Sequence, residues 1–185
     1  MSFREGLDDQ GTYYQINEVE GTTPILFIHG VGLDNSIWTN QIDFFKDRTT
    51  IVYDLIGHGL STCTLDEVNF EDFSKQIEGL LQILRIQKII VVGFSLGGLI
   101  AAHFSSTRKH YIEKIILFGT IFNRTDEQKK NAAERFINVK DTYLNAPQQL
   151  DRWFNQDYLS SHTDVAGKIT SILNNNNHED FLKSY

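Results

Sequence analysis

Short runs of apolar residues recur along the first part of the chain and alternate with longer amphipathic stretches. Four runs are continuous and rich in β-branched residues: 24–30 (PILFIHG), 49–54 (TTIVYD), 88–93 (KIIVVG) and 111–119 (YIEKIILFG). Runs of this kind are typical of strands buried on both faces of a sheet. Residues 12–19 (TYYQINEV) instead alternate between apolar and polar positions, which predicts an early strand.

The stretches between these strands have the spacing of amphipathic helices. Apolar residues from Phe70 to Leu84 recur every three or four positions, and another helix is expected after a cap at Asp34 or Asn35. A third helix begins within residues 95–106 (SLGGLIAAHFSS). Strands that alternate with helices predict crossover units. We therefore expect an α/β fold of three layers, with a mostly parallel sheet between two layers of helices.

The composition changes near residue 120. From there the chain is polar, has helical spacing and contains no strand-like run. Thr125 and Gln128 form the pattern of a capping box, and Pro147 suits the first turn of a helix. We therefore expect a sheet core over residues 1–119 and a helical cap over residues 120–185.

Length, charge and cysteine content limit the function classes. The chain has 185 residues, a formal net charge of -7 at pH 7 and a pI near 5.3. It offers no basic patch for nucleic acid or for an anionic membrane, so neither is expected as a partner. Cys63 is the only cysteine, which excludes a disulfide framework and a thiolate metal cluster. The start of the chain lacks a signal-peptide pattern and no run is long enough to span a membrane, so a cytoplasmic location is expected.

Residues 91–100 (VVGFSLGGLI) carry the main candidate for chemistry. Residues 93–97 (GFSLG) follow the G-x-S-x-G pattern of a nucleophile elbow, between a predicted strand and a predicted helix. A sharp turn at Ser95 needs small neighbours two positions away, and it exposes the serine oxygen at a helix N-terminus that stabilises negative charge. The alternative is an incidental serine in the glycine-rich turn of a nucleotide-binding fold, but the glycine patterns of those folds do not occur here.

Two further loops follow predicted strands. Residues 27–34 (FIHGVGLD) can aim a backbone N–H, that of Val31, at the same point as the N–H of Leu96. Two donors that converge on one oxygen form an oxyanion hole; a plain strand-to-helix turn is the alternative. Residues 53–61 (YDLIGHGLS) have the composition of a tight structural loop at the pocket edge, in which His58 is not expected to be catalytic.

In this order and spacing, the segments HGVGLDNSIW, YDLIGHGLS and GFSLGGLIA resemble the α/β-hydrolase superfamily over about residues 12–120. The segment LDRWFNQDYLSSH, within the predicted cap, is similar to the lids of β-ketoadipate enol-lactone hydrolases and related carboxylesterases. The resemblance implies a hydrolase core with a lid.

The resemblance also implies a general base and an orienting acid, in the chain order Ser, acid, His. We expect both beyond Tyr185, together with the last strands of the sheet, and hence a longer parent protein. Within the chain, the first carboxylate after the strand ending at Gly119 is Asp126. His29 is expected to support the oxyanion loop, and the remaining histidines to be solvated or to cap helices: His103, His110, His162 and His178.

The sequence therefore favours a serine hydrolase of small carboxylic esters or lactones that forms an acyl-enzyme on Ser95. His29, Gly30 and Trp153 are candidates for contacts with the substrate, and neither a metal nor a cofactor is expected. An acyltransferase or C–C hydrolase on the same scaffold is an alternative, as is a non-catalytic fragment or ligand-binding member of the fold. The apolar strand 111–119 would lie at an exposed sheet edge, which the cap, a second copy or another chain would cover.

Overall fold

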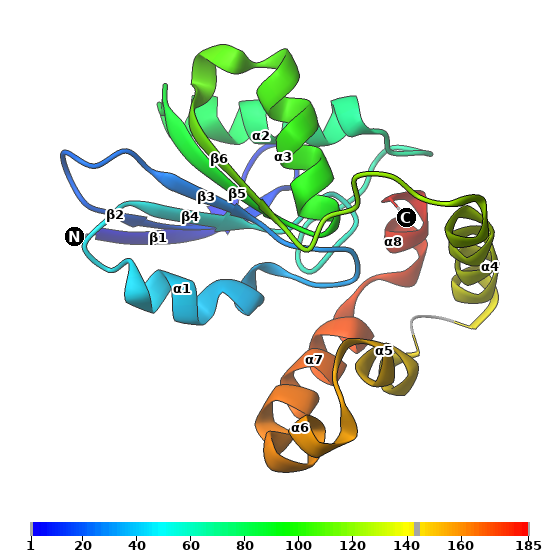
Figure 1. Cartoon of the computed structure of the whole chain (residues 1–185). Coiled ribbons are helices and arrows are strands. Elements are labelled where there is room, and N and C mark those ends of the chain that lie inside the picture. Colours follow the sequence, from blue (N-terminus) through cyan, green and yellow to red (C-terminus); the bar gives the residue numbers. More distant parts are fainter. Residues whose placement is uncertain (1, 143–144, 185) are drawn as a thin grey trace.

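A sheet with the strand order β1-β2-β4-β3-β5-β6 forms the centre of the molecule in the computed structural model, which describes residues 2–142 and 145–184 (Figure 1). The strands are β1 (Ser2–Leu7), β2 (Tyr13–Glu18), β3 (Ile25–Ile28), β4 (Thr50–Tyr53), β5 (Ile89–Phe94) and β6 (Ile112–Phe118). The pairs β4–β3, β3–β5 and β5–β6 are parallel, whereas β2 pairs antiparallel with both β1 and β4. The predicted α/β fold with a mostly parallel sheet is confirmed.

Strand β1 was not predicted from the sequence. Most of its side chains are exposed, so it has no apolar run that would mark it as a strand. Its main chain pairs with β2 along its whole length, and Arg4 forms an ion pair with Glu18 of β2 at 2.6 Å. Pairing to a neighbour that is itself anchored in the sheet, rather than burial, defines this strand.

Helices cover both faces of the sheet (Figure 1). The helices of this part are α1 (Thr39–Phe44), α2 (Phe70–Ile83) and α3 (Leu96–Thr107), with short 3₁₀ turns η1 (Asn35–Trp38) and η2 (Lys109–Tyr111). One apolar core contains residues of α2 and α3, and a second packs around Phe27 and Trp38 on the α1 face. The two cores show why the parallel strands are apolar on both sides.

The helix expected after Asp34 is less regular than predicted. Asp34 does act as a cap, since its carboxylate accepts the N–H of Ser36 at 2.9 Å, but the segment begins as the 3₁₀ turn η1 and continues as α1. Helix α2 matches its prediction closely: Asn69 accepts the N–H groups of its first turn, and Asp72 accepts the N–H of Asn69.

All described elements after β6 are helices: α4 (Asp126–Thr142), α5 (Ala146–Trp153), α6 (Gln156–Ser161), α7 (Thr163–Asn175) and α8 (His178–Ser184). We refer to α4–α8 as the C-terminal helices. The predicted capping box of α4 is present, because Thr125 and Gln128 exchange hydrogen bonds at 3.0 and 3.2 Å. Pro147 lies in the first turn of α5, as predicted. Within the described ranges, no helix is long and apolar enough to cross a bilayer.

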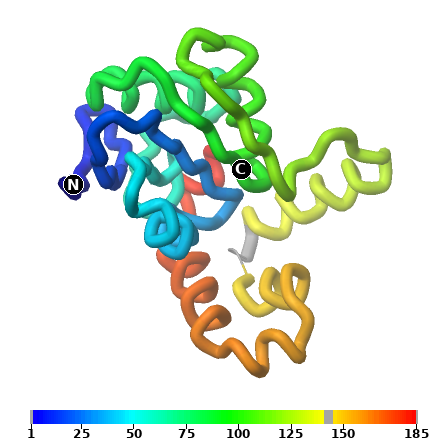
Figure 2. Tube along the Cα trace, turned by 60° about the vertical axis from the view of Figure 1, so that its left-hand side comes forward, coloured from blue at the N-terminus to red at the C-terminus, as the bar shows by residue number. Residues whose placement is uncertain are grey.

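Most of the C-terminal helices extend away from the sheet, but α8 returns to it (Figure 2). The N–H of Val68 donates to the carbonyl of Lys183 at 2.9 Å. Asn176, just before α8, accepts the N–H of Gly59 at 3.1 Å and donates to the carbonyl of Gly32 at 2.9 Å. These bonds attach the C-terminal helices to the loops that follow β3 and β4.

Strand β6 is the edge of the sheet, as expected from residues 111–119. Its side chains are largely exposed, with Ile116 at 50% and Phe118 at 42% of their full accessible areas. The proposal that another chain covers this edge remains a prediction.

Candidate active site

Ser95 lies at the junction of β5 and α3 in a strained backbone conformation. Its φ of 54° and ψ of -116° fall in a region that residues with a side chain rarely adopt. Hydrogen bonds fix this conformation: the N–H of Ser95 donates to the carbonyl of Phe118 at 3.2 Å, and its carbonyl accepts from the hydroxyl of Thr120 at 2.8 Å and the N–H of Gly98 at 3.0 Å. Neighbouring strand β6 thus helps to hold the elbow.

The glycines two positions before and after Ser95 are required by close packing. A Cβ on Gly93 would overlap the carbonyl of Gly97, because strand and helix turn back on each other. A Cβ on Gly97 would in turn overlap the carbonyl oxygens of Ile28 and His29 at the end of β3. The motif therefore brings the loop after β3 against the N-terminus of α3.

This approach places the two predicted oxyanion donors on one cavity. A Cβ on Gly30 would be 3.2 Å from the Cβ of Ser95, so the loop after β3 passes directly beside the serine. Val31 and Leu96 both line the cavity that Ser95 lines. Their arrangement is compatible with two N–H groups that converge on an oxyanion, and that role remains a prediction.

Buried polar residues hold the loop after β3 in position. His29 is fully buried; its Nε2 accepts the N–H of Leu55 at 3.0 Å, so its Nδ1 carries the proton and donates to the carbonyl of Gly30 at 2.8 Å. Burial lowers the pKa of His29, which keeps the ring neutral. The carboxylate of Asp54 accepts both the backbone and the side-chain N–H groups of Asn35 at 2.7 Å.

His58 is also fully buried and lies 5.4 Å from His29 between ring centroids. Burial lowers its pKa to about 3, and the neighbouring His29 adds to this effect. Its Nδ1 donates to the carbonyl of Ile56 at 3.1 Å, and the ring of Phe181 from α8 packs against it. The ring of His58 is therefore uncharged and lies in the core at the place where α8 packs against it.

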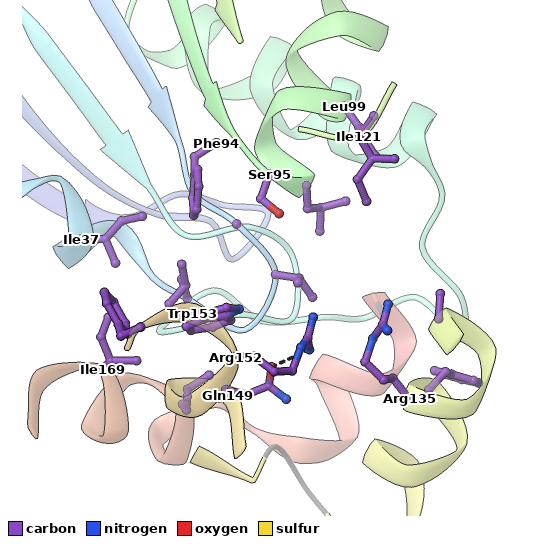
Figure 3. Close-up of a pocket in the computed structure, with 18 of the residues that line it drawn as sticks. Ile37, Phe94, Ser95, Leu99, Ile121, Arg135, Gln149, Arg152, Trp153 and Ile169 are labelled. Carbon is purple, nitrogen blue, oxygen red and sulfur yellow. Dashed lines mark hydrogen bonds between the residues drawn. The ribbon is translucent and has the colours of Figure 1, made fainter. Parts of the chain in front are cut away.

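The cavity beside Ser95 has a volume of about 840 Å³ and lies between the sheet and the C-terminal helices (Figure 3). The hydroxyl of Ser95 and the ring of Phe94 point into it from the sheet side, and Trp153 lies across from them (Figure 3). Gly30 and Trp153 line the cavity, and their contact with a substrate remains a prediction. His29 does not line the cavity: it lies behind the wall, with both ring nitrogens bonded to the main chain, because the loop it supports lies between it and the cavity.

The described part of the cavity wall contains no general base. None of its residues is a histidine, an aspartate or a glutamate, and no described residue forms a hydrogen bond with the hydroxyl of Ser95. The ring of His103 forms a hydrogen bond with the hydroxyl of Ser74 at 2.8 Å. The ring of His162 forms hydrogen bonds with the end of the preceding helix, α6. Across the described ranges, no three His, Cys, Asp or Glu side chains form a group that could hold a metal ion.

Sequence reasoning missed the positively charged residues of the cavity. Arg124, Arg135 and Arg152 all line it. They come from the loop before α4, from α4 and from α5, and no motif links them in the sequence. Their convergence depends on how the C-terminal helices fold, which residue spacing does not encode.

A strained serine between a parallel strand and a helix, beside the loop that follows a neighbouring strand, is the arrangement of an α/β-hydrolase nucleophile. The family model described as "alpha/beta hydrolase fold" matches residues 23–175. The chain therefore belongs to the α/β-hydrolase fold family, as the resemblance in the sequence implied.

Relatives in the family include hydrolases of known name. The chain is 27% identical over 180 residues to (E)-2-((N-methylformamido)methylene)succinate hydrolase of Acinetobacter baylyi, a match that covers 97% of this chain and 67% of that protein. It is 23% identical over 154 residues to 3-oxoadipate enol-lactonase 2 of the same organism, with 80% of this chain and 56% of that protein covered. The chain thus spans little more than half the length of the second relative.

Solved structures show the same fold. The enol-lactonase from Burkholderia xenovorans superposes with a TM-score of 0.85 at 22% identity, covering 93% of this chain and 67% of the other. A hydrolase from Pseudomonas aeruginosa superposes with a TM-score of 0.86 at 18% identity, covering 98% and 70%. At these identities the similarity establishes the fold alone.

Proposed function

We propose that the chain carries the nucleophile and the oxyanion donors of a serine hydrolase that acts on small carboxylic esters or lactones. The observation that carries the proposal is the strained Ser95, whose hydroxyl points into a cavity lined also by Val31 and Leu96. Strain of this kind, about 1–3 kcal/mol, persists where the surrounding structure over-determines it and is concentrated at functional sites. Two relatives are named as a hydrolase and an enol-lactonase, which supports the same reaction class.

In the proposed reaction the oxygen of Ser95 forms a bond with the acyl carbon while its proton passes to a general base. The backbone N–H groups of Val31 and Leu96 stabilise the negative charge that develops on the carbonyl oxygen. The bond to the leaving oxygen then breaks as that oxygen takes up the proton. Water attacks the acyl-enzyme by the same route, which releases the carboxylic acid and restores the hydroxyl.

The general base is proposed to come from residues outside these 185, because the described cavity wall holds no imidazole or carboxylate. The C-terminal helices are proposed to act as a lid, since they form the wall opposite Ser95. Phe94 and Trp153 would then enclose the apolar part of the substrate from opposite sides. An acyltransferase would share all of these steps except the final acceptor.

The test is intact-mass analysis of the folded chain after exposure to a fluorophosphonate probe, with and without added imidazole at constant pH and ionic strength. We expect slow formation of a single adduct, a rate that rises with imidazole because it supplies the missing base, and no adduct in Ser95→Ala. A folded chain that forms no Ser95-dependent adduct at any imidazole concentration would support the non-catalytic alternative. Rapid labelling that imidazole does not change would place a base within the chain.

A further inference from the structure

The charge of the cavity is opposite to that of the chain as a whole. The chain has a formal net charge of -7, yet three arginines and no acidic residue are found among the described residues that line the cavity. Arginine is always protonated in proteins, so the cavity wall carries three positive charges with no countercharge among its described residues. Like charges that share a partly enclosed space repel each other, and an anionic ligand would remove that repulsion.

The arginines line the same cavity as the reactive serine; Arg135 is half-buried, whereas Arg124 and Arg152 are also open to solvent. Figure 3 shows Arg135 and Arg152 pointing from the C-terminal helices into the cavity, with the hydroxyl of Ser95 on the opposite side. Arg152 donates from Nη1 to the side-chain oxygen of Gln149 at 3.0 Å, which orients its guanidinium. Among the residues that the structure describes, no carboxylate pairs with Arg135 or Arg152, whereas Arg108 elsewhere in the chain is paired with two glutamates.

Most of the remaining wall is apolar. Phe94 and Ile37 point into the space from the sheet side, and Ile169 and the ring of Trp153 lie on the side of the C-terminal helices (Figure 3). A ligand that fits both parts has a short hydrocarbon segment and an anionic end. The planar fork of a guanidinium matches a carboxylate, which accepts two parallel N–H bonds.

We propose that Arg135 and Arg152 select substrates that carry a free carboxylate, held against the C-terminal helices while the scissile acyl group lies at Ser95. This inference rests on the proposed function for the reacting end of the substrate, but the binding of the carboxylate does not depend on it. The substrate class is accordingly a small ester or lactone of a dicarboxylic acid. Arg124, which lines the same cavity, adds a third positive charge to the carboxylate end.

The test is calorimetric titration of Ser95→Ala with glutarate, and with glutaramide as the uncharged analogue of the same length. Because this variant cannot be acylated, binding is measured independently of nucleophilicity, and either proposal can fail without the other. We expect glutarate to bind and glutaramide to bind at least tenfold more weakly, since a hydrogen bond to a charged group contributes about 1.5–3 kcal/mol. The affinity for glutarate should fall as salt is added.

Variants then locate the binding groups. In the Ser95→Ala background, Arg135→Gln and Arg152→Gln should each weaken glutarate binding about tenfold or more, while Arg135→Lys should restore only part of it because lysine lacks the bidentate fork. Arg48→Gln is the matched control, since Arg48 is exposed and lies outside the cavity. Unfolding curves of each variant verify the fold. Equal binding of glutarate and glutaramide, equal binding of inorganic phosphate and glutarate, or an effect of Arg48→Gln as large as that of the cavity variants would overturn the proposal.

Discussion

The strain at Ser95 makes a prediction about stability that is independent of catalysis. Replacing Ser95 by glycine removes the cost of holding a side chain at φ 54° and ψ -116°, which is about 1–3 kcal/mol. Glycine also increases the conformational entropy of the unfolded chain, which costs about 0.5–1 kcal/mol. The difference predicts that Ser95→Gly is more stable than the parent by up to about 2.5 kcal/mol.

Ser95→Ala separates strain from the loss of the hydroxyl. Alanine keeps a Cβ and therefore keeps the strain, and the hydroxyl it removes forms no hydrogen bond with any described residue, so its stability should lie within about 0.5 kcal/mol of the parent. The assay is equilibrium unfolding in urea, monitored by circular dichroism. The unfolding midpoints of the parent, Ser95→Gly and Ser95→Ala are compared, provided that the dependence of the unfolding free energy on urea has the same slope in all three. A gain of 1 kcal/mol corresponds to roughly 2–4 °C in melting temperature for a chain of this size.

An ordinary helical position provides the matched control. Ala102 is exposed in the middle of α3, where glycine should be about 1 kcal/mol less stable than alanine. The glycine variant should therefore be less stable than the alanine variant at position 102 and more stable than it at position 95. If glycine is no more stable than alanine at position 95, the elbow stores no strain and our account of why this serine is held there is wrong.

Three other predictions follow from the packing around the site. Gly97→Ala should destabilise the fold by about 1–3 kcal/mol or more, since its Cβ would overlap the backbone that ends β3; urea unfolding measures this, and a neutral effect would contradict the close approach. Asn176→Ala should cost about 1–3 kcal/mol, because it leaves the carbonyl of Gly32 without its donor, and should speed proteolysis of the C-terminal helices, whereas Asn174→Ala should change neither. Burial lowers the pKa of His58 to about 3, below the 6.5 of an unfolded histidine, so the unfolded chain binds the extra proton. The free energy of unfolding should thus fall as the pH is lowered from about 6.5 toward 3, by up to ~1.4 kcal/mol per pH unit for this residue, and a His58→Asn variant with an unchanged slope would refute it.

The parallel strands and the elbow could be predicted because their signals are local. Continuous apolar runs mark strands that helices cover on both faces, and the small residues beside Ser95 are imposed by one sharp turn. Strand β1 escaped prediction because it is exposed and depends on pairing with β2 rather than on burial. Local sequence patterns thus reveal strands that are buried, but not exposed strands that depend on main-chain pairing at the edge of a sheet.

The residues that line the cavity could be predicted from the sequence only on the side of the sheet. The loop after β3 and the start of α3 belong to motifs of known geometry, so Val31 and Leu96 were expected beside Ser95. Arg135 and Arg152 lie on separate helices, and each alone has the appearance of a solvated surface residue. Only the fold of the C-terminal helices brings them to one space opposite the serine.

The central claim, that Ser95 takes up an acyl group, is tested most directly by trapping that group. The folded chain would be mixed with an activated ester such as p-nitrophenyl acetate, quenched in acid and digested, and the peptides analysed by mass. Because water also needs a base to release the acyl group, we predict that acetyl accumulates on the peptide containing Ser95 when no base is added, and that Ser95→Ala carries none there. Acetylation spread over lysines alone, at equal levels in the parent and in Ser95→Ala, would contradict the account.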